Sequence, residues 1–324
     1  MYKMSELDKK IIYELGMNAR QSYKKIAQKV RSSKEVIAYH ITQLQKDGII
    51  TKFVPVISLT KLGIYSFKIY LKLHGLSETA ENEFYAKLIA NPQIGWIAKS
   101  TGQWDLLLNF YSSDIISFAQ LKNKLLSNFS PYIAGYEITM IEDGIVLNRD
   151  YLIDKKTFYR KEFIFGGEKT KIELKPAEKK LLKLIRNDGR FQLVDISKKL
   201  NEDPRTTLAK IKKLEKIGII QGYTTFLDLK KIGYQLHKLC IYLEKYEQLE
   251  IDKVIAYIKQ NPFVIHITKA LGSWELEIEM ESDNFQFVYN YIKQIKNRFP
   301  EIIRHIDLAT IAEETKLEFY PENL

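Results

Sequence analysis

The sequence predicts an α+β protein made of two tandem copies of one unit, and three observations support this prediction. Residues recur at a constant spacing of 170, as in Gly48-Ile49-Ile50 and Gly218-Ile219-Ile220. Within each copy the hydrophobic period changes from about 3.6 residues to about two, which is typical of helices followed by strands. Positive charge is concentrated at matching places in both copies. A gapless match over this length indicates a duplicated set of domains rather than a short solenoid repeat.

The charge distribution indicates a polyanionic partner. The net charge of the 324 residues is +10, but residues 5–55 carry +5 and residues 175–222 carry +7. The rest of the chain therefore has a charge of −2. Two matching basic segments are the electrostatic pattern of a nucleic-acid-binding protein, with double-stranded DNA as the first candidate.

Composition argues against several other classes of protein. No apolar run approaches the roughly 18 residues of a membrane span, and no signal peptide is visible, so we expect a cytoplasmic protein without a membrane partner. The single cysteine, Cys240, excludes an intramolecular disulfide and a cysteine-rich zinc site. The five histidines lack metal-ligand spacing, and no catalytic triad, P-loop or dinucleotide fingerprint occurs. We therefore expect no metal, no cofactor and no catalytic residue.

Residues 1–57 are predicted to form a winged helix-turn-helix. Ser5-Glu6-Leu7-Asp8 has the spacing of a capping box and begins the first helix. A short second helix ends at Ser32-Ser33, and a third helix ends at Gly48, a favourable residue after a helix. The segment Ile49–Ile57 alternates around Pro55 and is expected to be an edge ribbon or wing.

Residues 62–143 are predicted to form a ferredoxin-like βαββαβ domain, because strand-like alternation and helical periodicity follow each other in that order. The predicted strands cover residues 65–73, 94–100, 104–111 and 133–141, and the predicted helices cover residues 80–90 and 114–126. Two helices would cover one face of the sheet and leave the other face bare. We therefore expect an intramolecular pseudo-dimer of the two copies, a homo-oligomer, or both.

The second copy repeats the plan. We assign residues 173–227 to a second winged helix-turn-helix and residues 232–316 to a second ferredoxin-like domain. Residues 144–172 form a linker between the copies, in which Tyr159–Phe165 could be a strand and Gly166-Gly167 a flexible joint.

These motifs resemble the Lrp/AsnC family, also called feast/famine regulators. In the first copy the resemblance is carried by Leu7-Asp8-x-x-Ile11 and Asn18-Ala19-Arg20-x-Ser22-Tyr23, and in the second by the segment from Lys210 to Ile220. Gly102-Gln103-Trp104-Asp105 and Gly272-Ser273-Trp274-Glu275 mark the sensing domains. The resemblance implies a DNA-binding transcription regulator that responds to a small ligand, with an amino acid as the expected effector.

The third helix of each copy supplies the predicted DNA contacts. In the second copy, phosphate contacts are expected from basic side chains, and the alternative is a solvated charged face. In the first copy, His40 and Gln43 could reach base edges, or this helix could simply pack. The predicted DNA-binding residues are Lys34, His40, Thr42, Gln43, Lys46, Arg205, Thr206, Lys210, Lys212, Lys213 and Lys216.

The resemblance also places an effector site at the turn between the second and third predicted strands of each ferredoxin-like domain. The predicted effector-binding residues are Gly102, Trp104, Asp105, Gly272, Trp274 and Glu275. Either carboxylate could pair with the ammonium group of an amino acid, while turn N–H groups hold its carboxylate. The structural alternative is that the glycines serve the turn and the tryptophans fill an interface.

A second class of function shares this architecture. Sirohaem decarboxylases resemble the same duplicated unit, and we expect them to carry an aromatic strand and basic or histidine residues in a haem pocket. The corresponding strand, Trp104–Phe110, is closer to the regulators. His266, which stands where the first copy has Trp96, is interpreted as a change in packing.

Overall fold

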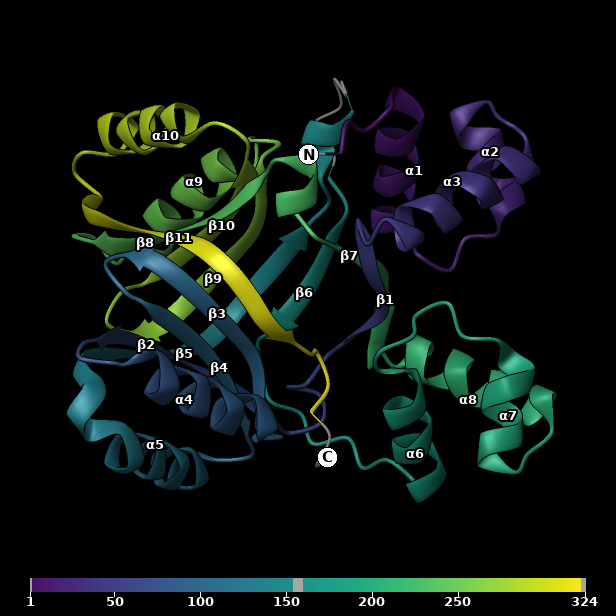
Figure 1. The fold of residues 1–324 in the computed structure, drawn as a ribbon, viewed down its shortest axis with the longest axis horizontal. Helices are drawn as coiled ribbons and strands as arrows, with labels where there is room; N and C mark the ends of the chain where they lie inside the picture. The colour runs from purple at the N-terminus through teal and green to yellow at the C-terminus, as the bar shows by residue number, and fades with distance from the viewer. Residues whose placement is uncertain (1, 154–159, 322–324) are drawn as a thin grey trace. The chain divides into compact units, whose positions relative to one another are not determined.

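The structure is a computed structural model that describes residues 2–153 and 160–321. It divides into two compact units, each assembled from both copies of the repeat. Unit 1 contains residues 1–58, 146–163 and 173–234, and unit 2 contains residues 59–145, 164–172 and 235–324. Both helix-turn-helix copies therefore share one unit, and both ferredoxin-like copies share the other (Figure 1).

The helices of unit 1 begin and end where the capping signals place them. They are α1 (Glu6–Met17), α2 (Tyr23–Val30), α3 (Lys34–Lys46), α6 (Pro176–Ile185), α7 (Leu193–Leu200) and α8 (Pro204–Lys216). The capping box is confirmed, because Ser5 Oγ accepts from the backbone N–H of Asp8 at 3.1 Å and Asp8 Oδ2 accepts from that of Ser5 at 2.9 Å. Pro176 and Pro204 are the first residues of their helices, where a missing N–H costs nothing.

The predicted wings join the two helix-turn-helix copies. β1 (Ile50–Ile57) pairs antiparallel with β7 (Ile220–Leu227) in a separate two-stranded sheet. Pro55 lies opposite Tyr223 in this ribbon. Each copy supplies one strand, so the ribbon is a pseudo-symmetric connection between equivalent segments. Figure 1 shows one three-helix group at either end of it.

Unit 2 contains the two βαββαβ domains. The first comprises β2 (Tyr65–Leu73), α4 (Glu78–Ala90), β3 (Ile94–Gly102), β4 (Leu106–Ser112), α5 (Ile115–Phe129) and β5 (Ile133–Leu147). The second comprises β8 (Gln235–Leu243), α9 (Gln248–Ile258), β9 (Val264–Gly272), β10 (Leu276–Ser282), α10 (Phe285–Arg298) and β11 (Ile303–Leu317). A short helix, η1 (Ser130–Tyr132), lies between α5 and β5, and another, η3 (Lys230–Ile232), follows β7 in unit 1.

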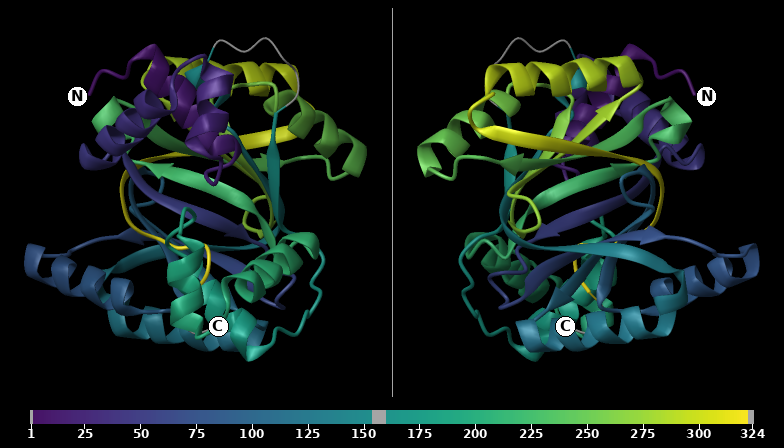
Figure 2. Two further views of the ribbon diagram at one scale, coloured as in Figure 1. Left: turned by 90° about the vertical axis from the view of Figure 1, so that its right-hand side faces the viewer. Right: turned by 90° about the vertical axis from the view of Figure 1, so that its left-hand side faces the viewer.

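The two domains pair through exchanged long strands. The strand order is β2-β4-β3-β11-β8-β10-β9-β5-β6, and β2 also pairs with β5, so eight strands close into a ring. The first part of β11 pairs with β8 of its own copy, and its second part pairs with β3 of the other copy. Figure 2 shows the helices of each domain on the outside, with the strands between them. The expected partner of each bare sheet face is therefore the other copy.

Gly102 and Gly272 are required by this exchange as well as by their turns. Their φ angles are +114° and +151°. A Cβ atom on Gly102 would lie 2.6 Å from the carbonyl oxygen of Leu308, and one on Gly272 would lie 2.3 Å from that of Ile138. Both oxygens belong to the exchanged strands. A side chain at either glycine would therefore push the two copies apart.

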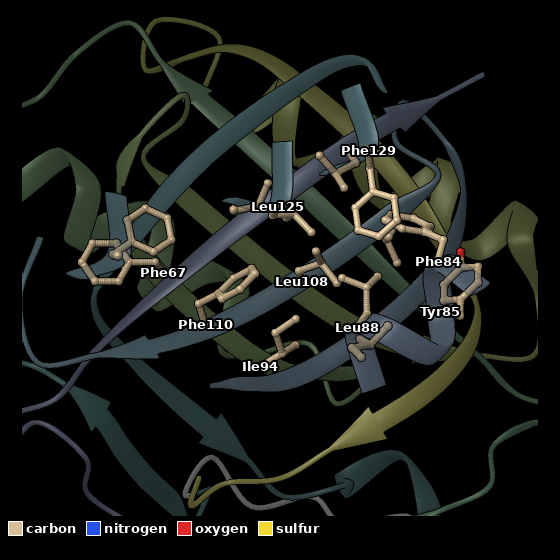
Figure 3. Packing of buried hydrophobic residues seen from close by; sticks show 14 residues of the cluster. Phe67, Phe84, Tyr85, Leu88, Ile94, Leu108, Phe110, Leu125 and Phe129 are labelled. Atoms are coloured by element: carbon tan, nitrogen blue, oxygen red, sulfur yellow. The ribbon is translucent and has the colours of Figure 1, made fainter. Parts of the chain in front are cut away.

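The core of the first ferredoxin-like domain lies between α4, α5 and the sheet (Figure 3). Phe67 stacks on Phe118 with ring centroids 4.1 Å apart, and Phe84 meets Phe129 edge to face at 4.3 Å. This packing fixes the outer face of the sheet, and leaves the other face to meet the second copy.

The segment expected to be a linker takes part in both units. β5 continues past residue 143 to Leu147, and η2 (Asp150–Leu152) follows it in unit 1. β6 (Glu162–Gly166) then adds a strand beside β5. The predicted strand is thus present, although Tyr159 lies outside the described residues. Within the described residues, no helix is long and apolar enough to cross a membrane.

Candidate nucleic-acid interface

In the first copy, one face of the third helix, α3, packs on α1 and α2. In the second copy, the equivalent face of α8 packs on α6 and α7. The opposite face of each helix is exposed. In α3 the buried residues are Ile37, Ile41 and Leu44, and in α8 they are Thr207, Ile211 and Leu214. These positions are equivalent under the spacing of 170. The exposed face of each helix is therefore the same face, and its chemistry can be compared directly.

The exposed face of α8 is basic. Arg205, Thr206, Lys212, Lys213 and Lys216 are all exposed. Lys213 Nζ lies 2.7 Å from Glu178 Oε1 and the lysine side chain is 52% exposed, so it remains within reach of solvent. An exposed row of cations on one helix can approach the phosphates of a duplex.

Lys210 has a different environment from the other predicted phosphate contacts. It is half-buried and its ammonium group forms an ion pair with Glu202 in the preceding loop. Much of its charge is therefore balanced by the protein. The sequence could not show this pairing, because Glu202 lies eight residues earlier on a different element.

The exposed face of α3 is mixed rather than basic. Lys34 and Lys46 are exposed at the two ends of the helix, and Gln43 is half-buried between them. Thr42 is exposed, but its hydroxyl donates to the carbonyl oxygen of Ala38 at 2.8 Å. Tyr39 on the same helix is 63% exposed, and it is not among the DNA-binding residues predicted from the sequence.

His40 is held by the first helix. Its Nδ1 lies 2.7 Å from Asp8 Oδ1, and Asp8 also closes the capping box of α1. Burial would raise the pKa of the Asp8 carboxyl, but hydrogen bonds from His40 and Ser5 outweigh burial and lower it. His40 therefore connects α3 to α1, which is a different role from the base contact expected from the sequence.

Two equivalent arginines connect the helix-turn-helix copies to each other. Arg20 donates to the carbonyl oxygens of Gly189 and Phe191 at 3.1 and 3.3 Å, and its guanidinium lies 3.9 Å from the centroid of the Phe191 ring. Arg190 donates to the carbonyl oxygens of Ala19 and Gln21 in return. The arginines are 170 residues apart, so the contact is reciprocal. Their equivalence was visible in the sequence, but the exchange of contacts was not.

The predicted effector residues of unit 2 differ in burial: the two glycines are exposed, the two carboxylates are half-buried and the two tryptophans are buried. Trp104 and Trp274 are buried, with ring centroids 4.9 Å apart, and Tyr70 lies against both. This arrangement agrees with the structural alternative, in which the tryptophans fill the interface between the copies.

The two predicted effector carboxylates cap backbone N–H groups at strand ends. Asp105 Oδ2 accepts from the N–H of Leu73 at 2.8 Å, and Glu275 Oε2 accepts from that of Leu243 at 2.7 Å. Lys72 Nζ also lies 3.1 Å from Asp105 Oδ1. Both carboxylates thus already hold donors in this conformation.

The change from Trp96 to His266 replaces an indole ring with a polar contact. His266 Nδ1 lies 2.5 Å from Glu279 Oε2, and Glu279 in turn pairs with Lys238. His266 is therefore a partly exposed member of a polar cluster whose other members are more deeply buried. Single-residue comparison with Trp96 could not reveal this cluster, because its members come from several strands.

Comparison with known proteins identifies the helix-turn-helix copies. Residues 4–51 and 174–221 both match the family model described as winged helix-turn-helix DNA-binding. An uncharacterised HTH-type transcriptional regulator of Pyrococcus furiosus is 28% identical over 150 residues, covering 45% of this chain and 99% of the relative. The proline dehydrogenase transcriptional activator of Rhodobacter capsulatus is 27% identical over 140 residues, covering 43% of this chain and 90% of the relative. Each relative thus corresponds to about one copy.

A solved structure matches the duplicated architecture as a whole. The sirohaem decarboxylase NirDL aligns with 97% of this chain and 93% of its own, with a TM-score of 0.63 and 16% identity. At this identity the likeness concerns the fold. Two copies of a winged helix-turn-helix, each followed by a ferredoxin-like domain, are thus the confirmed architecture.

Proposed function

We propose that this chain, a tandem-duplicated relative of the Lrp/AsnC-type regulators, regulates transcription by binding one DNA duplex with two unequal recognition helices. The observation that carries the proposal is the pair of winged helix-turn-helix domains in unit 1, each with an exposed third helix. A third helix of this kind fits the major groove.

Contacts within unit 1 fix the spacing between the two recognition helices. The β1–β7 ribbon and the reciprocal bonds of Arg20 and Arg190 hold the copies together. A fixed spacing between recognition helices selects DNA with a matching spacing between half-sites.

The two recognition helices differ in chemistry, so the two half-sites differ as well. α8 presents Arg205, Lys212 and Lys216 to solvent, which suits phosphate contacts with little sequence preference. α3 presents Tyr39, Thr42 and a partly exposed Gln43, which suits contacts to base edges. A symmetric dimer reads a palindrome, whereas this fused pair would read a non-palindromic site.

The experiment that tests this function is selection of bound duplexes from fragmented genomic DNA. We expect enrichment of sites with two unlike halves, and loss of enrichment at the base-reading half when Gln43 is replaced by alanine. Recovery of random fragments by the wild-type protein would contradict sequence-specific regulation.

We also propose that unit 2 receives a small-molecule effector, with an amino acid as the expected ligand. The support is the resemblance of the glycine turns at Gly102 and Gly272 to those of the sensing domains. Asp105 and Glu275 would have to exchange a backbone N–H for the ligand's ammonium group. Thermal shift of the full chain with each standard amino acid tests this, and no shift with any of them would contradict it.

A second candidate function is decarboxylation of a haem precursor. The whole-chain fold likeness to the sirohaem decarboxylase NirDL favours it. Incubation of the protein with sirohaem, followed by absorption spectroscopy and product analysis, separates the two candidates. Loss of a carboxyl group from sirohaem would favour the enzyme, whereas an unchanged spectrum together with specific DNA binding would favour the regulator.

A further inference from the structure

A cluster of buried charges lies inside the ring of strands where the two ferredoxin-like copies meet. Lys68 of the first copy pairs with Glu277 of the second, and Lys238 lies 3.1 Å from the same carboxylate and 2.5 Å from Glu279. The side chains of Lys68, Lys238 and Glu277 are at most 8% exposed. Charges buried to this degree are tolerated only when they are paired.

The Glu277 carboxylate is the centre of the cluster. Besides the two lysines, Thr139 Oγ1 and Trp274 Nε1 each donate to its Oε1 at 3.1 Å. Burial would raise the pKa of this carboxyl, but Lys238 and Lys68 outweigh burial and lower the pKa to about 2. Two of its donors, Lys68 and Thr139, come from the first copy, and the other two, Lys238 and Trp274, come from the second copy, so pairing of the copies completes its set of donors.

The two copies contribute different residues to the cluster. Lys68 and Lys238 are equivalent under the spacing of 170, so both copies supply a lysine. The equivalents of Glu277 and Glu279 in the first copy are Leu107 and Asn109, both buried on β4. Only the second copy therefore supplies the carboxylates.

Each possible pairing of copies would bury a different set of charges at these four positions. Pairing two first copies would bury two lysines against Leu107 and Asn109, without a carboxylate from these positions. Pairing two second copies would bury four glutamates with two lysines. Pairing unlike copies brings together two lysines and two glutamates at these four positions, whose charges balance, and His266 lies beside Glu279 at the edge of the cluster. Like pairs would thus carry uncompensated buried charge, and removing one partner of a buried pair is strongly destabilising.

We propose that the Lys68–Glu277–Lys238–Glu279 cluster selects the pairing of unlike copies, so that each ferredoxin-like domain accepts only the other type as its partner. Like-with-like association, between chains or after strand exchange, is rejected by buried charge.

The test uses the full chain with a protease site inserted after Glu168, an exposed position. The cleaved protein is unfolded in denaturant and refolded, and native mass spectrometry reads which halves reassociate. We expect unlike pairs almost alone. A variant with Lys68→Met, Lys238→Met, Glu277→Leu and Glu279→Asn is expected to form a larger share of like pairs. An equal share of like pairs in both proteins would overturn the proposal.

A second measurement, the unfolding equilibrium of variants of the uncut chain, does not depend on reassembly of the halves. Glu277→Leu removes the carboxylate that pairs with buried Lys68 and leaves Lys238 with Glu279 alone, so it is expected to raise the unfolding equilibrium constant by roughly a hundredfold or more. Adding Lys68→Met removes the lysine that has lost its carboxylate and should recover part of that loss. A double variant no more stable than Glu277→Leu alone would show that charge does not govern this interface.

Discussion

The proposed interface makes a quantitative prediction about salt. The exposed cations on the recognition helices are Lys34, Lys46, Arg205, Lys212, Lys213 and Lys216. If each neutralises one phosphate, including Lys213, which would have to leave Glu178, the logarithm of the association constant falls with the logarithm of salt concentration with a slope of about −5. Between 50 and 200 mM salt, affinity would then fall by roughly a thousandfold.

The matched variant is Lys212→Ala with Lys216→Ala, because both lysines are exposed on α8. Removal of two phosphate contacts should reduce the magnitude of the slope by about two and weaken binding to all sequences similarly. Fluorescence anisotropy with a labelled duplex, titrated at several salt concentrations, measures both quantities. Lys210→Ala is the control: its ammonium group is paired with Glu202, so its effect on the slope should be smaller. An unchanged slope in the double variant would refute the assignment of α8 to phosphate binding.

Three further predictions concern stability. Arg20→Ala and Arg190→Ala should each lower the free energy of unfolding by about 2 kcal/mol, because each removes charged hydrogen bonds. Urea denaturation measures this change, and a variant as stable as the wild type would contradict the reciprocal contact. Burial lowers the pKa of His237 from 6.5 to about 4, so the folded state favours the neutral ring. The contribution of neutral His237 to the free energy of unfolding is thus fully present above about pH 6.5. It should decrease by about 3 kcal/mol as the pH falls toward 4. Urea titrations at several pH values measure this dependence, and His237→Phe should remove it. Gly272→Ala should destabilise the chain because its Cβ would meet a backbone oxygen of the exchanged strand, whereas Gly135→Ala, with open space at its Cβ, should change the melting temperature little.

The sequence predicted the elements of the fold because their signals are local. The capping box at Ser5, proline at the start of two helices and the change of hydrophobic period each depend on neighbouring residues. The exchange of β5 and β11 depends on contacts between distant segments. Bare sheet faces indicated that the copies pair, but could not indicate which strand edges meet.

The candidate site was predicted in outline for the same reason. Helical periodicity placed Lys212 and Lys216 on the exposed face of α8 from the sequence alone. It could not show that Lys210 pairs with Glu202 or that His40 bonds to Asp8, because those partners lie on other elements. The reciprocal arginines and the buried charges were likewise hidden, since each needs both copies in place.

The central claim is that the two unlike recognition helices bind one duplex at the same time. Thr42 and Lys212 are equivalent exposed positions on α3 and α8. Each can be changed singly to cysteine and coupled to a DNA-cleaving reagent, because the natural Cys240 is buried. We expect the two tethered proteins to cut one selected duplex at two separate places, one in each half-site. Cleavage at a single place by both proteins, or by only one of them, would contradict the claim.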